Sequence, residues 1–271
     1  MQDRIVSYYN RSNWLYKYFW YNNKTLGLHF GIDSKKTKSL NQSIENQYKI
    51  LIKLGKIKKE MKVLDAGCGV GGAGIYLAEK TKAMLFGISL VPEQIQQAKA
   101  NASKREVSDL TRFEVMDYTK TSFKDNYFDV IFGIESICHS YPKELFLKEA
   151  NRVLKKTGKL IIADGYRTRK EESNQENKIT KNLCSAWKLK EMIEIKTMTQ
   201  KIVYSGFKIE KKLDKTNNLS FSKNRFKLLG FLGQFFTFLP GVRDNVSAIK
   251  SVLKGLEINL FGYFILVATK K

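Results

Sequence analysis

Between residues 60 and 213, short apolar runs alternate with longer segments in which apolar residues recur every three or four positions. The short runs, bounded by glycine or polar residues, predict buried β-strands, and the periodic segments predict amphipathic helices. The expected strands span 62–67, 83–90, 111–117, 128–135, 158–164, 207–213 and 260–271. The expected helices span 5–21, 39–55, 73–80, 91–106, 142–155 and 188–206, and Gly55 is expected as a C-cap.

Strands that alternate with helices predict a parallel sheet with helices on both faces. The last two strands have no simple crossover helix between them, because the apolar segment 214–258 intervenes. We therefore predict a single α/β domain over 1–271, with a Rossmann-like sheet of seven strands whose last strand is an antiparallel addition at the sheet edge. A helical N-terminal lid segment (1–58) is expected before the ligand-binding core (60–165), and 214–258 is expected to be a helical cap over the ligand end.

The first strand leads into VLDAGCGVGG, residues 63–72, where four glycines fall within six positions. Such glycines allow a tight turn and a close approach of a ligand beyond the carboxyl ends of the strands. The letters also fit a dinucleotide pattern. Asp65 argues against that ligand, because a carboxylate repels a diphosphate and attracts an ammonium group. S-adenosylmethionine carries an ammonium and no phosphate, so it suits this loop, unless Asp65 only caps a turn.

Polar side chains follow the second and third strands. Ser89 stands where nucleoside sites commonly carry an acid for the ribose hydroxyls, and the Gln94 amide is a candidate for that bond. Asp117 is placed to accept from an adenine amino group, and Tyr118 to flank the ring. The alternatives are that Gln94 faces solvent and that Asp117 belongs to a surface turn.

The order and spacing of four segments, VLDAGCGVGG, GISLVPEQIQQA, EVMDYTKTSF and YFDVIFGIESICHSYP, resemble those of class I S-adenosylmethionine-dependent methyltransferases. The resemblance covers roughly 60–165 and looks closest to the sterol 24-C-methyltransferase and tocopherol methyltransferase group. It implies that the cofactor is S-adenosylmethionine and that the product is S-adenosylhomocysteine. The implied contacts are Asp65, Gly67 and Gly69 for the methionine part, Ser89 and Gln94 for the ribose, and Asp117 for the adenine. The other expected cofactor contacts are Cys68, Leu90, Tyr118 and Glu135.

The fourth strand ends in IESICHSYP, whose polar residues are expected at the pocket mouth. Glu135 would stabilise a cation formed on the acceptor or accept its proton, and His139 would act as a base with a pKa near neutrality. The family's matching Glu and His line the active site. The alternatives are that Glu135 contacts the cofactor alone and that His139 satisfies a backbone group. Ser136 and Tyr141 are expected in the substrate pocket.

The N-terminal stretch IVSYYNRSNWLYKYFWY is dense in aromatic residues. It predicts either packing for a lid helix or an aromatic enclosure for the sulfonium and an apolar substrate. Tyr9 and His29 are the expected pocket-facing residues. Cys138 is expected to be a buried small residue rather than a nucleophile.

Composition adds a formal net charge of +22, from 48 basic and 26 acidic residues. Only nine of the basic residues are arginine, which is the side chain suited to bidentate phosphate and base contacts, so nucleic acid is not expected as a partner. A solvated lysine-rich surface is favoured over an anionic membrane or substrate. The three scattered cysteines favour a reducing compartment, and no metal site is expected.

The segment LSFSKNRFKLLGFLGQFFTFLP, residues 219–240, combines Phe and Leu with early basic residues. It predicts a lid over a hydrophobic acceptor, a surface that lies on a membrane, or an additional core helix. With the resemblance, these features favour a cytoplasmic or peripherally membrane-bound enzyme, monomeric or homodimeric. We expect it to methylate a small apolar acceptor, first of all a carbon of an isoprenoid or sterol-like compound. Methylation of an oxygen or nitrogen atom of another metabolite, and binding without turnover, are the alternatives.

Overall fold

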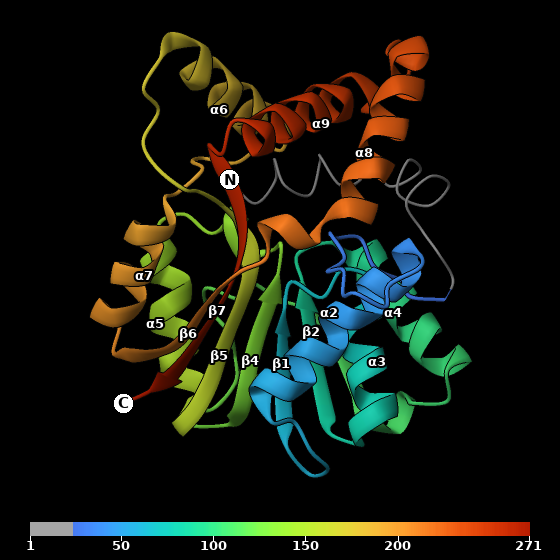
Figure 1. Cartoon of the computed structure of the whole chain (residues 1–271). Helices are drawn as coiled ribbons and strands as arrows, with labels where there is room; N and C mark the ends of the chain where they lie inside the picture. The colour runs from blue at the N-terminus through green and yellow to red at the C-terminus, as the bar shows by residue number, and fades with distance from the viewer. Residues whose placement is uncertain (1–23) are drawn as a thin grey trace.

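A computed structural model of the protein describes residues 24–271 (Figure 1). Its strands are β1 (Lys62–Ala66), β2 (Met84–Ser89), β3 (Thr111–Val115), β4 (Phe128–Ile134), β5 (Leu154–Arg167), β6 (Phe207–Asp214) and β7 (Phe261–Lys270). Its α-helices are α2 (Leu40–Gly55), α3 (Gly72–Thr81), α4 (Pro92–Lys104), α5 (Lys143–Val153), α6 (Asn174–Ala186), α7 (Ile195–Tyr204), α8 (Ser220–Gly233) and α9 (Val242–Glu257). Four short 3₁₀ turns are η2 (Ser108–Leu110), η3 (Ile137–His139), η4 (Thr216–Asn218) and η5 (Gln234–Phe236). The predicted helix 5–21 and Tyr9 lie outside the described residues.

All seven strands form one sheet in the order β3-β2-β1-β4-β5-β7-β6. The pairs among β3, β2, β1, β4 and β5 are parallel, and β7 runs antiparallel to both β5 and β6. The predicted α/β class and the antiparallel last strand are confirmed. The predicted edge position of that strand is wrong, because β7 lies between β5 and β6. The apolar β7 is buried along most of its length, whereas the lysine-rich β6 is exposed and suits an edge.

Alternate residues of the central strands enter two separate hydrophobic cores, one on each face of the sheet. On one face, Val63 and Phe132 pack with apolar residues of α2, α3 and α4. On the other face, Leu64 and Ile131 pack with residues of α5 and α7. This two-sided burial explains why the parallel strands read as continuous apolar runs.

Helical structure between β5 and β6 differs from the prediction of one helix over 188–206. The structure has α6 at Asn174–Ala186 and a shorter α7 that begins at Ile195. The helix α6 was not predicted because its sequence is polar and lacks an apolar periodicity. It starts after the N-cap Ser173, and Leu183 and Ala186 are its only buried residues. The residues before α7 instead run beside the end of β5, where the Arg167 amide donates to the Ile193 carbonyl at 3.0 Å.

The predicted C-cap at Gly55 is also wrong. Gly55 is the last residue of α2, and Lys56 adopts the left-handed conformation that ends the helix, with φ of 49°. Gly55 is buried, and a Cβ atom there would lie 2.8 Å from Ile57 Cγ1. Close packing rather than a turn therefore requires glycine at this position.

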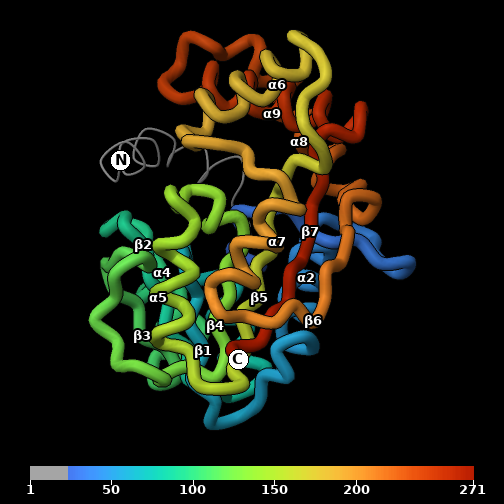
Figure 2. Tube along the Cα trace, turned by 90° about the vertical axis from the view of Figure 1, so that its left-hand side faces the viewer, coloured from blue at the N-terminus to red at the C-terminus, as the bar shows by residue number. Residues whose placement is uncertain are grey.

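The helices α6, α8 and α9 form a cap at one end of the sheet (Figure 1). The turned view in Figure 2 keeps the same three helices together above the sheet. The predicted helical insert before the final strand is thus confirmed, as α8, η5 and α9. Within residues 24–271, no helix is both long and apolar enough to cross a membrane.

Candidate functional site

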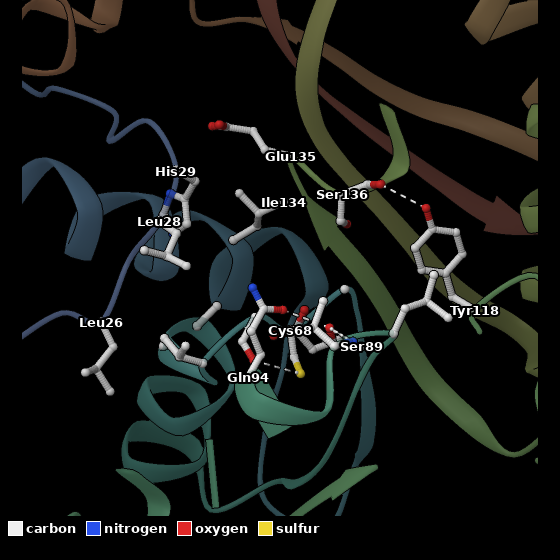
Figure 3. Close-up of a pocket in the computed structure, with 18 of the residues that line it drawn as sticks. Leu26, Leu28, His29, Cys68, Ser89, Gln94, Tyr118, Ile134, Glu135 and Ser136 are labelled. Carbon is white, nitrogen blue, oxygen red and sulfur yellow. Dashed lines mark hydrogen bonds between the residues drawn. The ribbon is translucent and has the colours of Figure 1, made fainter. Parts of the chain in front are cut away.

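A cavity opens beyond the carboxyl ends of β1, β2 and β4, where the strand order reverses, and we call it the glycine-loop cavity (Figure 3). Open α/β sheets bind their ligands at such a reversal. The sequence-predicted residues that line this cavity are His29, Asp65, Gly67, Cys68, Gly69, Ser89, Leu90, Gln94, Tyr118, Glu135, Ser136 and His139. Asp117 and Tyr141 are not among its lining residues.

The glycine loop is fixed to the neighbouring strands by backbone bonds. The amides of Gly67 and Cys68 both donate to the Ile88 carbonyl, at 3.0 and 2.9 Å. Gly67 has φ of 98°, and a Cβ atom there would collide with the Ser136 side chain. The Ser136 hydroxyl in turn donates to the Ala66 carbonyl at 2.5 Å. The turn therefore requires glycine at position 67.

Asp65 is a buried carboxyl at the wall of this cavity, with 3 % of its surface exposed. Burial raises the pKa of Asp65 to about 8, because the charged form is poorly solvated there. Burial, followed by the charge of Asp65, raises the pKa of Tyr48 and of Cys68 well above their usual ranges. A cationic ligand group would compensate for the lost solvation of the Asp65 carboxylate.

Ser89 and Gln94 lie together at the end of β2 and the start of α4 (Figure 3). The Ser89 hydroxyl donates to the Gln94 side-chain oxygen at 2.9 Å and accepts from the Val91 amide at 3.2 Å. Both side chains are 8 % exposed, so the alternative of a solvent-facing Gln94 is wrong. The amide group of Gln94 is thereby held at the cavity wall, where it can bond to ligand hydroxyls.

Of the two predicted site residues that follow β3, Tyr118 lines the glycine-loop cavity and Asp117 does not. The Tyr118 hydroxyl donates to the Ser136 carbonyl at 3.0 Å (Figure 3). The Tyr118 ring packs on Phe146. Asp117 instead accepts from the amide and the hydroxyl of Thr119, both at 2.8 Å. These bonds use one carboxylate oxygen of the half-buried Asp117, and its contact with adenine stays a prediction. Tyr141, which was expected in the substrate pocket, is 47 % exposed and lines neither this cavity nor the second one described below.

Glu135 follows β4 in a left-handed conformation, with φ of 48°. Its carboxylate accepts a 2.8 Å hydrogen bond from the Phe30 amide. Burial and the nearby charge of Asp164 raise the pKa of Glu135 to about 8, against the effects of hydrogen bonds from Phe30 and the Tyr263 hydroxyl. The side chain is therefore a carboxyl whose proton is exchanged near neutral pH.

The two histidines of the cavity are neutral at pH 7. Burial, and then the charge of Lys143, lowers the pKa of His139 to about 4, below the ordinary value on which its expected role as a base rested. Burial also lowers the pKa of His29 to about 4. Its ring nitrogens contact the Phe30 carbonyl at 2.7 Å and the Tyr48 hydroxyl at 3.1 Å, which fixes the imidazole in place.

A second cavity, which we call the cap cavity, lies between the sheet and the cap helices. It shares Leu28, Glu135 and His139 with the glycine-loop cavity. The other lining side chains are mostly apolar, and they are Phe30, Cys138, Asp164, Gly165, Leu183, Trp187, Leu189, Met192, Leu219, Val252, Leu256, Phe261, Gly262 and Tyr263. The two cavities therefore meet at Glu135 and His139.

Asp164 is a second carboxyl in the cap cavity that the sequence interpretation missed. It is 4 % exposed and accepts from the Cys138 amide at 2.8 Å and the Gly165 amide at 2.9 Å. Burial raises the pKa of Asp164 to about 6, against these bonds and the charge of Lys143. The signal for it was present, because Asp164 directly follows the apolar run Leu160–Ala163, as Asp65 follows Val63 and Leu64. Tyr48 and Leu28 gave no such signal, since they read as ordinary apolar positions.

Metal ligands are not gathered in the part of the chain that the structure describes. Residues 24–271 contain no group of three His, Cys, Asp or Glu side chains that could hold a metal ion.

Comparison with known sequences identifies the family to which the chain belongs. A family model described as a methyltransferase domain matches residues 57–224. The chain is 39 % identical over 105 residues to a chloroplastic tocopherol O-methyltransferase of Arabidopsis thaliana, covering 39 % of this chain and 30 % of that protein. It is 32 % identical over 173 residues to a sterol 24-C-methyltransferase of Saccharomyces cerevisiae, covering 64 % and 44 %. The chain thus aligns with less than half the length of these relatives.

Solved structures share the whole fold at low identity. The [4+2]-cyclase SpnF superposes with a TM-score of 0.84 at 19 % identity, covering 98 % of this chain and 94 % of that one. A geranyl diphosphate methyltransferase bound to GPP and sinefungin superposes with a TM-score of 0.79 at 15 % identity, covering 100 % and 99 %. At these identities the likeness establishes the arrangement of sheet and cap alone.

Proposed function

Because the chain belongs to the methyltransferase-domain family, within the class I S-adenosylmethionine-dependent methyltransferases, we propose that it methylates a small, largely apolar acceptor. The observation that carries this proposal is the junction of the two cavities at Glu135 and His139. One cavity offers polar groups on a glycine loop, and the other offers apolar walls. A methyl donor in the first and an acceptor in the second would meet at that junction.

The residues of the glycine-loop cavity fit S-adenosylmethionine. The buried Asp65 carboxyl suits the ammonium of the methionine part, beside the loop of Gly67, Cys68 and Gly69. Ser89, Leu90 and Gln94 are placed for the ribose, and Tyr118 for the adenine ring. Asp117 is not included in this assignment, because it does not line the cavity. Another group of the cavity wall would then accept the hydrogen bond from the adenine amino group. A diphosphate does not fit, since the buried acid would oppose it.

The cap cavity defines the acceptor by what lines it. Among the described residues, none of its lining side chains is lysine or arginine. The half-buried carboxyl of Glu135 and the buried carboxyl of Asp164 stand among apolar and aromatic groups. Such a site suits an acceptor that is neutral and becomes positively charged as it is methylated, and it disfavours an anionic acceptor such as a prenyl diphosphate.

When bound, the sulfonium of the donor supplies an electrophilic methyl group. The acceptor atom forms a bond to that carbon, the sulfur–methyl bond breaks, and S-adenosylhomocysteine leaves. Glu135 and Asp164 stabilise the positive charge that develops on the acceptor, and ionised Glu135 accepts the proton that an alkene carbon loses. Neutral His139 and the apolar walls position the acceptor and exclude water. The first-ranked acceptor is an isoprenoid or sterol-like alkene, methylated at carbon.

Methylation at oxygen is the alternative that one observation favours. The Arabidopsis relative is named an O-methyltransferase. Glu135 would then accept the proton of an acceptor hydroxyl.

The test is turnover with methyl-labelled S-adenosylmethionine and a panel of isoprenoid alkenes, sterols, prenylated phenols, quinols and amines. We expect S-adenosylhomocysteine to form in proportion to an apolar member, with NMR locating the methyl group on carbon. A label on oxygen would establish the alternative. Tight donor binding without S-adenosylhomocysteine from any member would replace catalysis with binding alone.

A further inference from the structure

The outer side of α8 and η5 exposes a cluster of large apolar side chains, which we call the phenylalanine face. Its members, with their exposed fractions, are Leu228 (52 %), Phe231 (59 %), Leu232 (42 %), Phe235 (65 %), Phe236 (50 %) and Phe238 (78 %). Single exposed apolar residues are ordinary, but a contiguous group marks an interaction site. We propose that the phenylalanine face docks the protein on the surface of an anionic lipid bilayer.

Packing of α8 against α9 turns these side chains outward. A Cβ atom at Gly230 would lie 2.9 Å from Ile249 Cγ2, and one at Gly233 would lie 2.6 Å from Val246 Cγ2. The two glycines, three residues apart, therefore form the side of α8 that meets α9. Phe231 and Phe235 lie elsewhere on the helix surface and contact each other, with ring centroids 5.6 Å apart.

The charge around the phenylalanine face suits acidic headgroups. From the start of α8 to the end of α9, residues 220–257 contain six basic residues, Lys223, Arg225, Lys227, Arg243, Lys250 and Lys254, and two acidic residues, Asp244 and Glu257. Asp244 pairs with Lys188 at 3.4 Å, and Glu257 pairs with Lys254 at 3.3 Å. Apolar side chains that enter the headgroup layer beside exposed lysines combine the two attractions that hold a protein on an anionic membrane.

The same charge argues against a second copy of this chain as the occupant. A symmetric dimer through the phenylalanine face would bring two sets of these basic residues together and repel. The net charge of +22 adds to that repulsion over longer distances. An anionic bilayer supplies the opposite sign.

The helical insert that carries the phenylalanine face also contributes to the wall of the proposed acceptor site, a point that rests on the proposed function. Leu219, at the N-cap of α8, lines the cap cavity, as do Val252 and Leu256 of α9. The elements that would lie on the bilayer thus also enclose the apolar cavity.

The test is sedimentation of the full-length protein with vesicles of phosphatidylcholine alone, or of phosphatidylcholine with phosphatidylglycerol. We expect binding to the anionic vesicles that weakens as salt is added. The double variant Phe235→Ser/Phe238→Ser should weaken it by at least about tenfold. Lys227→Gln/Lys250→Gln should weaken binding to the anionic vesicles and reduce its salt dependence.

Matched controls change the same residue types elsewhere. Leu145→Ser removes an apolar side chain that is 47 % exposed on α5, and Lys211→Gln/Lys212→Gln removes two exposed charges from β6. These variants should bind as the unaltered protein does. Circular dichroism and calorimetry with S-adenosylmethionine establish that every variant folds.

Failure to bind either vesicle, or equal binding by the phenylalanine variant, would overturn the proposal. So would a dimer in light scattering that Phe235→Ser/Phe238→Ser dissociates while vesicles are ignored, since the occupant would then be a second copy. Vesicle binding is measured without an acceptor, so a failure of methyl transfer leaves this test unaffected.

Discussion

The carboxylate of Glu135 accepts a hydrogen bond of 2.8 Å from the backbone amide of Phe30, across 105 residues of sequence. This bond fastens the segment before α2 over the junction of the two cavities. His29, the preceding residue, is fixed by its contact with the Tyr48 hydroxyl. The position of the Glu135 side chain therefore depends on a part of the chain that lies outside the glycine-loop motif.

Replacement of Glu135 by glutamine tests its proposed role in the reaction. Gln keeps an oxygen that can accept from Phe30, but it cannot take a proton or carry a negative charge. We expect turnover to fall on the order of a hundredfold or more while the affinity for S-adenosylmethionine changes little. Calorimetry and steady-state kinetics separate the two quantities. Equal losses in both would make Glu135 a cofactor contact.

The pH profile of kcat/KM provides a second measurement on the same residue. Glu135 has a pKa of about 8 and faces Asp164 and Tyr263, so its ionised form is the minor one at pH 7. If that form accepts the proton, activity should rise as the pH passes through 8. Glu135→Gln should lose this rise, and Asp164→Asn should move it to lower pH by removing a neighbouring negative charge. A profile that is identical in all three proteins would contradict the assignment.

The variant Asp65→Asn tests the cation site by two quantities, the affinity for S-adenosylmethionine and the number of protons released when it binds. At about pH 6.5 the free carboxyl is mostly protonated, because its pKa is about 8. An ammonium favours the ionised form, so binding lowers this pKa and releases up to about one proton per ligand. Affinity should therefore rise with pH from 6 toward 7. Asn should weaken binding by at least about thirtyfold.

The proton count comes from calorimetry in buffers of different ionisation enthalpy. Glu135→Gln is the matched control, because it removes another carboxyl with a pKa of about 8 and leaves Asp65 in place. Proton release that persists undiminished in Asp65→Asn would assign the ammonium to a different group.

Substitutions at Gly67 and Gly69 distinguish a glycine that the turn requires from a glycine that leaves room for the ligand. Gly67→Ala places a Cβ against Ser136 at φ of 98°, and should lower the free energy of unfolding by about 2 to 4 kcal/mol. Gly69 has φ of 52°, and the nearest atom to its Cβ is Leu28 Cδ1 at 3.8 Å. Gly69→Ala should therefore cost about 1 kcal/mol yet weaken donor binding, since it projects into the cavity. Denaturant titration measures the first effect and calorimetry the second. Equal destabilisation by the two would contradict this account of Gly67.

The sequence was most informative where one local rule determines the structure. The apolar runs identified every strand, and the glycines between β1 and α3 marked the loop, because a parallel core and a tight turn each demand particular residues. The position of β7 inside the sheet was not predicted. Comparing the two C-terminal strands explains this position. The apolar β7 is buried when strands flank it on both sides, whereas the lysine-rich β6 tolerates exposure at the sheet edge.

What was missed depends on contacts between distant segments. The pKa of His139 falls because the folded chain buries it near Lys143, which no local pattern reveals. Asp117 followed its strand as predicted, but it bonds to Thr119 in a turn of its own. The polar α6 forms because it packs on α9, another element of the cap. Tertiary context decides each of these cases, and it also creates the cap cavity that defines the acceptor.

Gly165 offers a graded test of that cavity. It lies in β5 opposite Tyr263, and its Cβ would meet Met192 Cε at an ordinary 3.4 Å. Gly165→Ala should therefore leave the fold and the turnover within about twofold, whereas Gly165→Leu extends into the acceptor space. We expect Leu to raise the KM for a bulky acceptor at least about tenfold, since overfilled cavities exclude their ligands, with the affinity for S-adenosylmethionine unchanged. Smaller acceptors should be affected less. If Leu leaves the KM of every acceptor unaltered, the acceptor binds elsewhere and the two carboxyls of the cap cavity have a different purpose.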